Sequence, residues 1–148
     1  MGYIIHLRKK VDIIRLWHYK LLPYLPNSQL IAQKRECDLI WKDIANGKQT
    51  NHILINYIWS YEDYKYQLII YYWMLKIEFK KRGFNFRESA NANLLIEYRG
   101  LIQPFAYHHN DKYLVQCFYN LQEKYDRGQK DFTYDTYKNL LKFMEDLL

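Results

Sequence analysis

The sequence predicts an all-α protein, a compact single domain of about five helices packed around one buried central helix. The chain has 148 residues, of which 49% are apolar, and this suits one domain with a packed core. It contains only five Gly and three Pro, too few for the many tight turns of a β-sandwich or barrel. One stretch of 22 residues, 61–82, contains neither type.

Two prolines, Pro23 and Pro26, mark an irregular segment before the first helix. Asn27 or Ser28 is expected to cap this helix, which runs to about Ala45 because an Asn-Gly pair follows. Its apolar stripe consists of Leu30, Cys37, Ile40, Trp41 and Ile44, and the residues expected to point away from the stripe are Lys34, Asp38 and Lys42.

Glu36 lies at the edge of this stripe, one position from the core, with Gln29 two turns earlier on the same line. A carboxyl group between core and solvent stays accessible while burial shifts its pKa. The residue pattern alone fits either such an acid or an ordinary glutamate of an amphipathic helix.

The second helix, Tyr61 to Arg82, is expected to be the buried central one. Its middle, residues 68–75, is apolar on all sides, and it ends in three basic residues followed by Gly83. Three further helices are predicted over residues 88–99, 111–126 and 134–147, the last of them capped by Thr133.

The charge and the aromatic content leave two interpretations open. The formal net charge is +6, and Tyr, Phe and Trp make up 18% of the chain. Basic groups that meet phosphates and rings that stack on bases are typical of nucleic-acid binding. Rings buried in a core and a charge that serves solubility explain the same numbers.

The sequence gives little support to a secreted, membrane-spanning or metal-binding protein. The N-terminus has its basic residues after a short apolar stretch, the reverse of a secretory signal, and the longest uncharged apolar stretch, 66–75, is too short to span a bilayer. Cys37 and Cys117 are expected to be buried free thiols of a cytoplasmic protein. The five histidines form no recognisable metal-binding pattern.

A set of short motifs follows the chain in a fixed order. They are Arg15-Leu16-Trp17-His18, Leu22-Pro23-Tyr24-Leu25-Pro26, Gln29-Leu30, Gln33-Lys34-Arg35-Glu36-Cys37, and residues 51–57, 80–84, 116–121 and 127–132. Together they resemble the bacterial branch of the pyrimidine-dimer DNA glycosylase (endonuclease V) family, whose members open with Met-Arg-Leu-Trp-His and carry an Arg-Glu pair further along. The resemblance covers nearly everything from Arg15 onward.

The resemblance implies a small all-α enzyme that repairs double-stranded DNA with damaged bases, as a monomer and without metal or cofactor. Its nucleophile is a free N-terminal α-amine, whose pKa of about 7.7–8 leaves a useful fraction unprotonated at neutral pH. The amine attacks the sugar C1′, displaces the base and leaves an imine, from which β-elimination breaks the strand.

In this family pattern Glu36 matches the essential carboxylate, which stabilises the developing positive charge and transfers protons. Arg35 matches an arginine that binds DNA phosphate near the lesion. Gln29 stands where the phage-type enzyme has a histidine. The other residues expected to contact DNA are Lys34, His18, Trp17 and Tyr24.

One departure concerns the N-terminus. In relatives the chain begins at the position of Ile14 or Arg15, which places the reactive amine there, whereas residues 1–13 come first in this sequence. We therefore divide the chain into an extension, 1–13, and a glycosylase-like domain, 14–148. Three explanations stay open: translation starts at the Ile14 codon, a protease exposes the amine, or the extension is retained.

If the extension is retained, the rival function is a non-catalytic helical protein that binds nucleic acid or an acidic partner through a basic face. The phage-type enzyme ends in an aromatic and basic tail associated with dimer binding, and this chain ends in a helical stretch instead.

Overall fold

The computed structural model describes residues 14–92 and 102–147. Within these residues it has four α-helices, two 3-10 helices and no strand. In chain order they are η1 (Tyr19–Tyr24), α2 (Asn27–Ala45), η2 (Asn56–Ser60), α3 (Tyr64–Lys81), α4 (Asp111–Asp126) and α5 (Tyr134–Leu147). The prediction of a compact all-α fold is confirmed.

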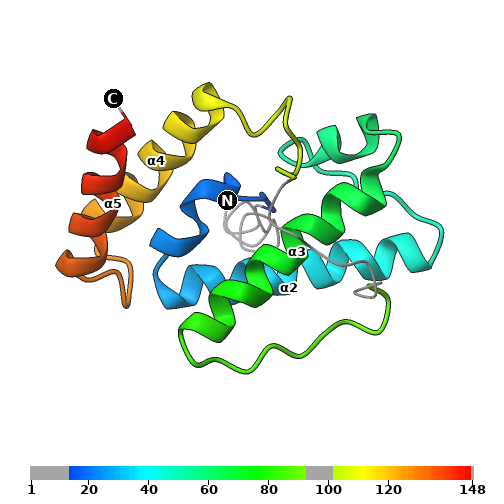
Figure 1. Ribbon diagram of the computed structural model, residues 1–148, viewed down its shortest axis with the longest axis horizontal. Helices are drawn as coiled ribbons and strands as arrows, with labels where there is room; N and C mark the ends of the chain where they lie inside the picture. The colour runs from blue at the N-terminus through cyan, green and yellow to red at the C-terminus, as the bar shows by residue number, and fades with distance from the viewer. Residues whose placement is uncertain (1–13, 93–101, 148) are drawn as a thin grey trace, which may run out of the picture.

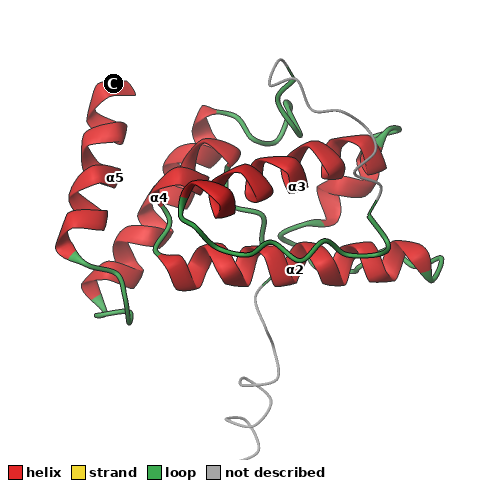
Figure 2. Ribbon diagram, turned by 60° about the horizontal axis from the view of Figure 1, so that its bottom comes forward, coloured by secondary structure: helices red, strands yellow, loops and turns green. Residues whose placement is uncertain are grey.

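The helices form two pairs that η1 joins. Helices α2 and α3 lie side by side, and α4 and α5 form a second pair at the other end of the molecule (Figures 1 and 2). The short helix η1 contacts α3, α4 and α5. The segment that leads into η1 is therefore surrounded by helices distant in the sequence.

Helix α3 supplies much of the core, as the sequence predicts. Tyr71 and Tyr72 are fully buried, although each has a hydroxyl group, because both hydroxyls form hydrogen bonds inside the protein. Trp73 and Met74 are only half-buried. The other buried apolar residues of α3 are Leu68, Ile69, Ile70, Leu75 and Phe79.

Helix α3 is shorter than predicted at both ends. It begins at Tyr64 because Tyr61 closes η2 with a backbone hydrogen bond to Ile58. It ends at Lys81, and Arg82 turns away to donate to the backbone oxygens of residues 22, 23 and 25. Arg82 thus ties the end of α3 to η1.

The prediction of a helix over residues 88–99 is wrong for the residues that the structure describes. Residues 88–92 form loop and turn, and the rest of that prediction lies outside the described residues. Tertiary contacts hold this loop against α3: the Ser89 N–H donates to the Tyr72 hydroxyl, and Glu88 pairs with Lys76. Such contacts override a local helical preference.

The N-cap prediction for α2 is also wrong. Pro26 occupies the cap position without a side-chain bond, and the Asp131 carboxylate accepts from the Ser28 N–H and hydroxyl instead. The bounds of α4 and α5 agree with the prediction, and the Thr133 hydroxyl accepts from the Thr136 N–H as a cap. Cys37 and Cys117 are buried free thiols, as expected.

Candidate active site

Side chains from three helices hold the backbone of residues 15–17. The carbonyl oxygen of residue 15 accepts from Gln33 Nε2 of α2 at 2.7 Å. The carbonyl of residue 16 accepts from the Tyr113 hydroxyl of α4, and that of residue 17 from the Tyr71 hydroxyl of α3, both at 2.6 Å. Three successive peptide groups are therefore fixed by parts of the chain that are far apart in the sequence.

Glu36 faces this segment from α2. Its Oε2 accepts from Gln33 Nε2 at 2.9 Å, and its carboxylate also accepts a hydrogen bond from the backbone N–H of Arg15. The side chain is half-buried, and this burial raises the pKa of Glu36 from 4.5 to about 7. The Arg15 N–H and guanidinium, the Gln33 amide and Arg35 act in the opposite direction but are outweighed.

A carboxyl group with this pKa exchanges protons readily at neutral pH, as acid and base catalysts do. Its partner, the Arg15 N–H, lies one peptide unit from residue 14, and consecutive Cα atoms are about 3.8 Å apart. Ile14 is half-buried and packs against the core. The structure thus brings the two positions predicted for the nucleophile, Ile14 and Arg15, together with Glu36.

The raised pKa of Glu36 predicts a stability effect. Between pH 4.5 and about 7 the carboxyl ionises in the unfolded chain before it ionises in the folded one, so stability falls across this range and stays lower above it. Glu36→Gln has no carboxyl group to ionise at this position, so it does not lose this stability as the pH rises. At pH 8 we expect its free energy of unfolding to exceed wild type by about 1–2 kcal/mol, allowing for partial exposure.

Urea unfolding of both proteins at pH 4 and pH 8 measures the difference. We expect the two proteins to have equal stability at pH 4, where the carboxyl is protonated in both states. An equal stability at pH 8 as well would show that folding does not alter the pKa of Glu36.

A second feature is a hollow of about 510 Å³ between α2 and the loop after α3. Its lining combines apolar side chains with three basic residues, Lys34, Arg35 and Arg87, and we call it the basic hollow. Arg35 is exposed, whereas Lys34 pairs with Asp38 at 2.7 Å and lies over the Phe86 ring. The hollow thus places Arg35 beside further positive charge.

Two details of α2 differ from the prediction. Lys34 and Asp38 were expected to point away from the core, but both are partly buried. The reason is the loop after α3 and the Tyr72 hydroxyl, which donates to Asp38 at 2.6 Å. Arg87 was missed because nothing in the sequence indicates that its loop returns to α2.

Trp17 and His18, which were expected to contact DNA, are 3% and 1% exposed. Trp17 packs in the core, with the Arg15 guanidinium 5.0 Å from the centre of its ring. His18 Nδ1 accepts from the Lys20 N–H, and burial lowers the pKa of His18 to about 4. In this structure neither ring lies at the surface.

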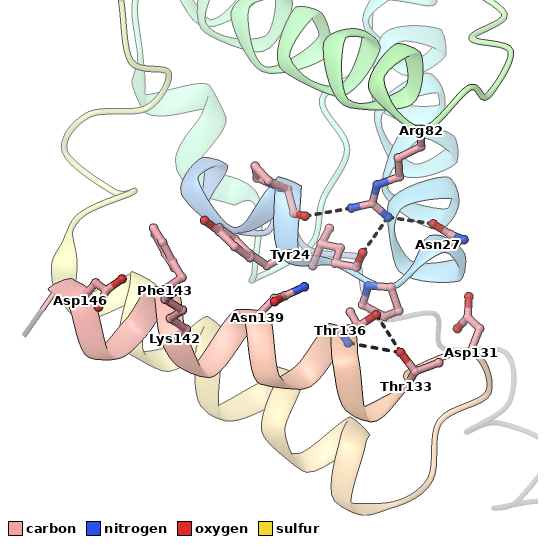
Figure 3. A pocket seen from close by; sticks show the side chains of 13 residues that line it. Tyr24, Asn27, Arg82, Asp131, Thr133, Thr136, Asn139, Lys142, Phe143 and Asp146 are labelled. Atoms are coloured by element: carbon pink, nitrogen blue, oxygen red, sulfur yellow. Dashed lines mark hydrogen bonds between the residues drawn. The ribbon is translucent and has the colours of Figure 1, made fainter.

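Tyr24 and Gln29 lie away from Glu36. Tyr24 stacks on Phe143, with ring centres 4.5 Å apart, in a polar pocket of about 680 Å³ between η1 and α5 (Figure 3). The lining of that pocket does not include Glu36. Gln29 donates to the side chain of Gln129 at 2.9 Å, and this bond links α2 to the segment before α5.

Gln33 is another site residue that the sequence analysis missed. It is 1% exposed, a rare placement for glutamine, and it lies within the apolar stripe of α2. A polar residue inside an apolar stripe, one turn before an acid, is the signal that could have revealed it.

No group of three His, Cys, Asp or Glu that could hold a metal occurs in the described part, nor does any helix there have the length and apolar character to cross a membrane.

The comparisons with known proteins identify the class as a DNA glycosylase. The sequence model of the family described as pyrimidine dimer DNA glycosylase matches residues 14–92, more than half of the chain. The chain therefore belongs to the pyrimidine dimer DNA glycosylase family. The match begins at Ile14 and includes all of α2 and α3. No curated protein and no solved structure matches the chain.

Proposed function

We propose that the protein is a DNA glycosylase with abasic-site lyase activity, which acts on damaged pyrimidines in double-stranded DNA. The observation that carries the proposal is the position of Glu36, a carboxyl group with a pKa of about 7 that is hydrogen-bonded to the backbone beside residue 14. In this proposal residues 14–148 form the working domain, and the nucleophile is an α-amine at residue 14.

The chemistry follows from that placement. The neutral amine attacks C1′ of the sugar, the bond from C1′ to the base breaks, and its electron pair leaves with the base, which takes up a proton. The Glu36 carboxylate stabilises the positive charge that develops at C1′ and accepts a proton from the attacking amine. The bond between C1′ and O4′ then breaks and O4′ takes up the proton from Glu36, which is again ionised, so ring opening gives a protonated imine between the amine nitrogen and C1′.

Strand cleavage follows from the imine. Removal of a proton from C2′ sends its electrons toward the imine, and the bond between C3′ and the phosphate oxygen breaks. Glu36 is placed to accept this proton too, because the imine forms beside it. These steps need neither metal nor cofactor, and we expect the protein to carry them out in the cytoplasm as a monomer.

The test compares two proteins, the full chain and a chain that begins at residue 14. The shorter chain is released from a fusion by a protease that leaves no extra residue. We expect it to nick a duplex that carries an abasic site or a pyrimidine dimer, and to leave an intact duplex uncut. Salt-dependent binding without nicking by the shorter chain would favour the rival function, a non-catalytic DNA-binding protein.

Arg35 is expected to contribute to DNA binding through phosphate. The logarithm of the binding constant falls linearly with the logarithm of the salt concentration. Each phosphate that a basic side chain neutralises makes this slope steeper by about 0.9. We therefore expect Arg35→Ala and Arg87→Ala each to weaken duplex binding and to reduce this slope by about one. Fluorescence anisotropy between about 50 and 200 mM salt measures both quantities.

Lys138, an exposed residue on α5, provides the matched control. Lys138→Ala removes the same formal charge and is expected to leave the slope unchanged. Equal reductions for all three variants would mean that net charge, and not the basic hollow, determines binding.

A further inference from the structure

The buried amide of Gln33 satisfies all of its hydrogen-bonding capacity within the site. Its Oε1 accepts from the Trp17 N–H at 2.6 Å and from the Tyr71 hydroxyl at 3.0 Å. Its Nε2 donates to the Arg15 carbonyl at 2.7 Å and to Glu36 Oε2 at 2.9 Å. A primary amide offers two donors and two acceptor positions, so every one is used.

These four bonds fix the orientation of the amide. The Trp17 N–H can only donate and the Arg15 carbonyl can only accept, so a flipped amide would lose the bonds to both. The nitrogen is therefore held toward the Glu36 carboxylate. At 1% exposure of Gln33, water cannot take over these bonds.

The bonds also connect the two groups that the proposed reaction uses. One donor of Gln33 holds the backbone of residue 15, and the other holds the carboxylate of Glu36. We infer that Gln33 is a positioning residue, which sets the distance between the amine at residue 14 and Glu36 and presents a hydrogen-bond donor to the ionised carboxylate. This inference rests on the proposed function.

Tyr71 offers a matched comparison within the same network. Its single hydroxyl proton lies between the Trp17 carbonyl, at 2.6 Å, and Gln33 Oε1, at 3.0 Å, and neither of these acceptors belongs to Glu36. Tyr71→Phe therefore removes a bond that holds the backbone and leaves the donor to the carboxylate in place. If Gln33 only held the backbone in place, replacing Gln33 and replacing Tyr71 would have the same effect on the ionisation of Glu36.

The test follows the ionisation of Glu36 in the full chain, by carbon-13 NMR of its side-chain carboxyl group. The ionisable groups around Glu36 are the Arg15 guanidinium from the N-terminal segment, Arg35 and Cys37 on α2, and Tyr113 on α4. None of them is changed in the variants. The wild-type midpoint is expected near 7.

For Gln33→Met, which keeps the length of the side chain, we expect the midpoint to rise by about one pH unit, because the charged form no longer has this donor. For Tyr71→Phe we expect no change. A wild-type midpoint in Gln33→Met would overturn the inference. If Gln33→Met does not fold, as circular dichroism would show, Gln33→Asn replaces it, because its amide is one methylene shorter and draws the donor away from the carboxylate; a wild-type midpoint in that variant would likewise overturn the inference.

A kinetic measurement separates this inference from the proposed function. In chains that begin at residue 14, we expect imine formation to be about tenfold to hundredfold slower in Gln33→Met than in wild type. Activity in wild type with no change in Gln33→Met would overturn the role of Gln33 alone. Absence of imine in wild type would overturn the proposed function, while the NMR result would still decide whether Gln33 holds the carboxylate.

Discussion

Glu36→Gln is expected to reduce the rate of strand cleavage by about a thousandfold, within the range found when a general acid or base is removed. Glutamine has nearly the same shape, and its oxygen can still accept from Gln33. It cannot accept a proton or balance the positive charge at C1′. The reduction should therefore lie in the chemical step, measured by single-turnover cleavage of an abasic duplex.

DNA binding should be retained in this variant, because a carboxylate repels phosphate and its removal takes away no attraction to DNA. We expect the dissociation constant for the same duplex to stay within about threefold of wild type or to improve slightly. Glu145→Gln, on the exposed side of α5, is the control and should cleave normally. Cleavage by Glu36→Gln at the wild-type rate would remove Glu36 from the mechanism.

The second large effect concerns the position of the amine. A chain that begins at Ile14 should be active, and the same chain with one additional residue before Ile14 should be at least about a hundredfold slower. One residue displaces the amine by about 3.8 Å from Glu36 and turns the nitrogen of Ile14 into an amide, whose lone pair is delocalised. Cleavage rates of the two chains on one abasic duplex measure the effect.

Both chains should bind the duplex equally, since the extra residue leaves Arg35 and the basic hollow unchanged. This binding is the control for folding. Equal cleavage by both chains would show that the nucleophile lies elsewhere, for example at a lysine.

Much of the fold was predictable because it depends on local patterns. The bounds of α4 and α5 follow from helical periodicity and caps, and the buried middle of α3 follows from a continuous apolar run. The loop at 88–92 was not predictable, because a hydrogen bond to Tyr72 and an ion pair with Lys76 decide its shape. The prediction of the α2 cap was wrong for the same reason, because the carboxylate that accepts from the Ser28 N–H belongs to Asp131, which is distant in the sequence.

The site shows the same division. The position of Glu36 at the edge of an apolar stripe indicates a carboxyl group that burial can perturb, and the structure gives it a pKa near 7. The roles of Gln33, Tyr71 and Tyr113 could not be predicted, because each depends on a bond across the fold. Trp17 was predicted to contact DNA because enzymes of this family need stacking partners, and the burial of its ring in the core could not be foreseen from the sequence.

The most direct test of the account is borohydride trapping, with the chain that begins at Ile14 and a duplex containing a single abasic site. Borohydride reduces an imine to a stable amine, so the protein and the DNA stay linked. After proteolysis, mass spectrometry locates the linked residue. We predict that the sugar is attached to the α-nitrogen of residue 14. A sugar attached to a lysine, or no linked product although the strand is cut, would contradict it.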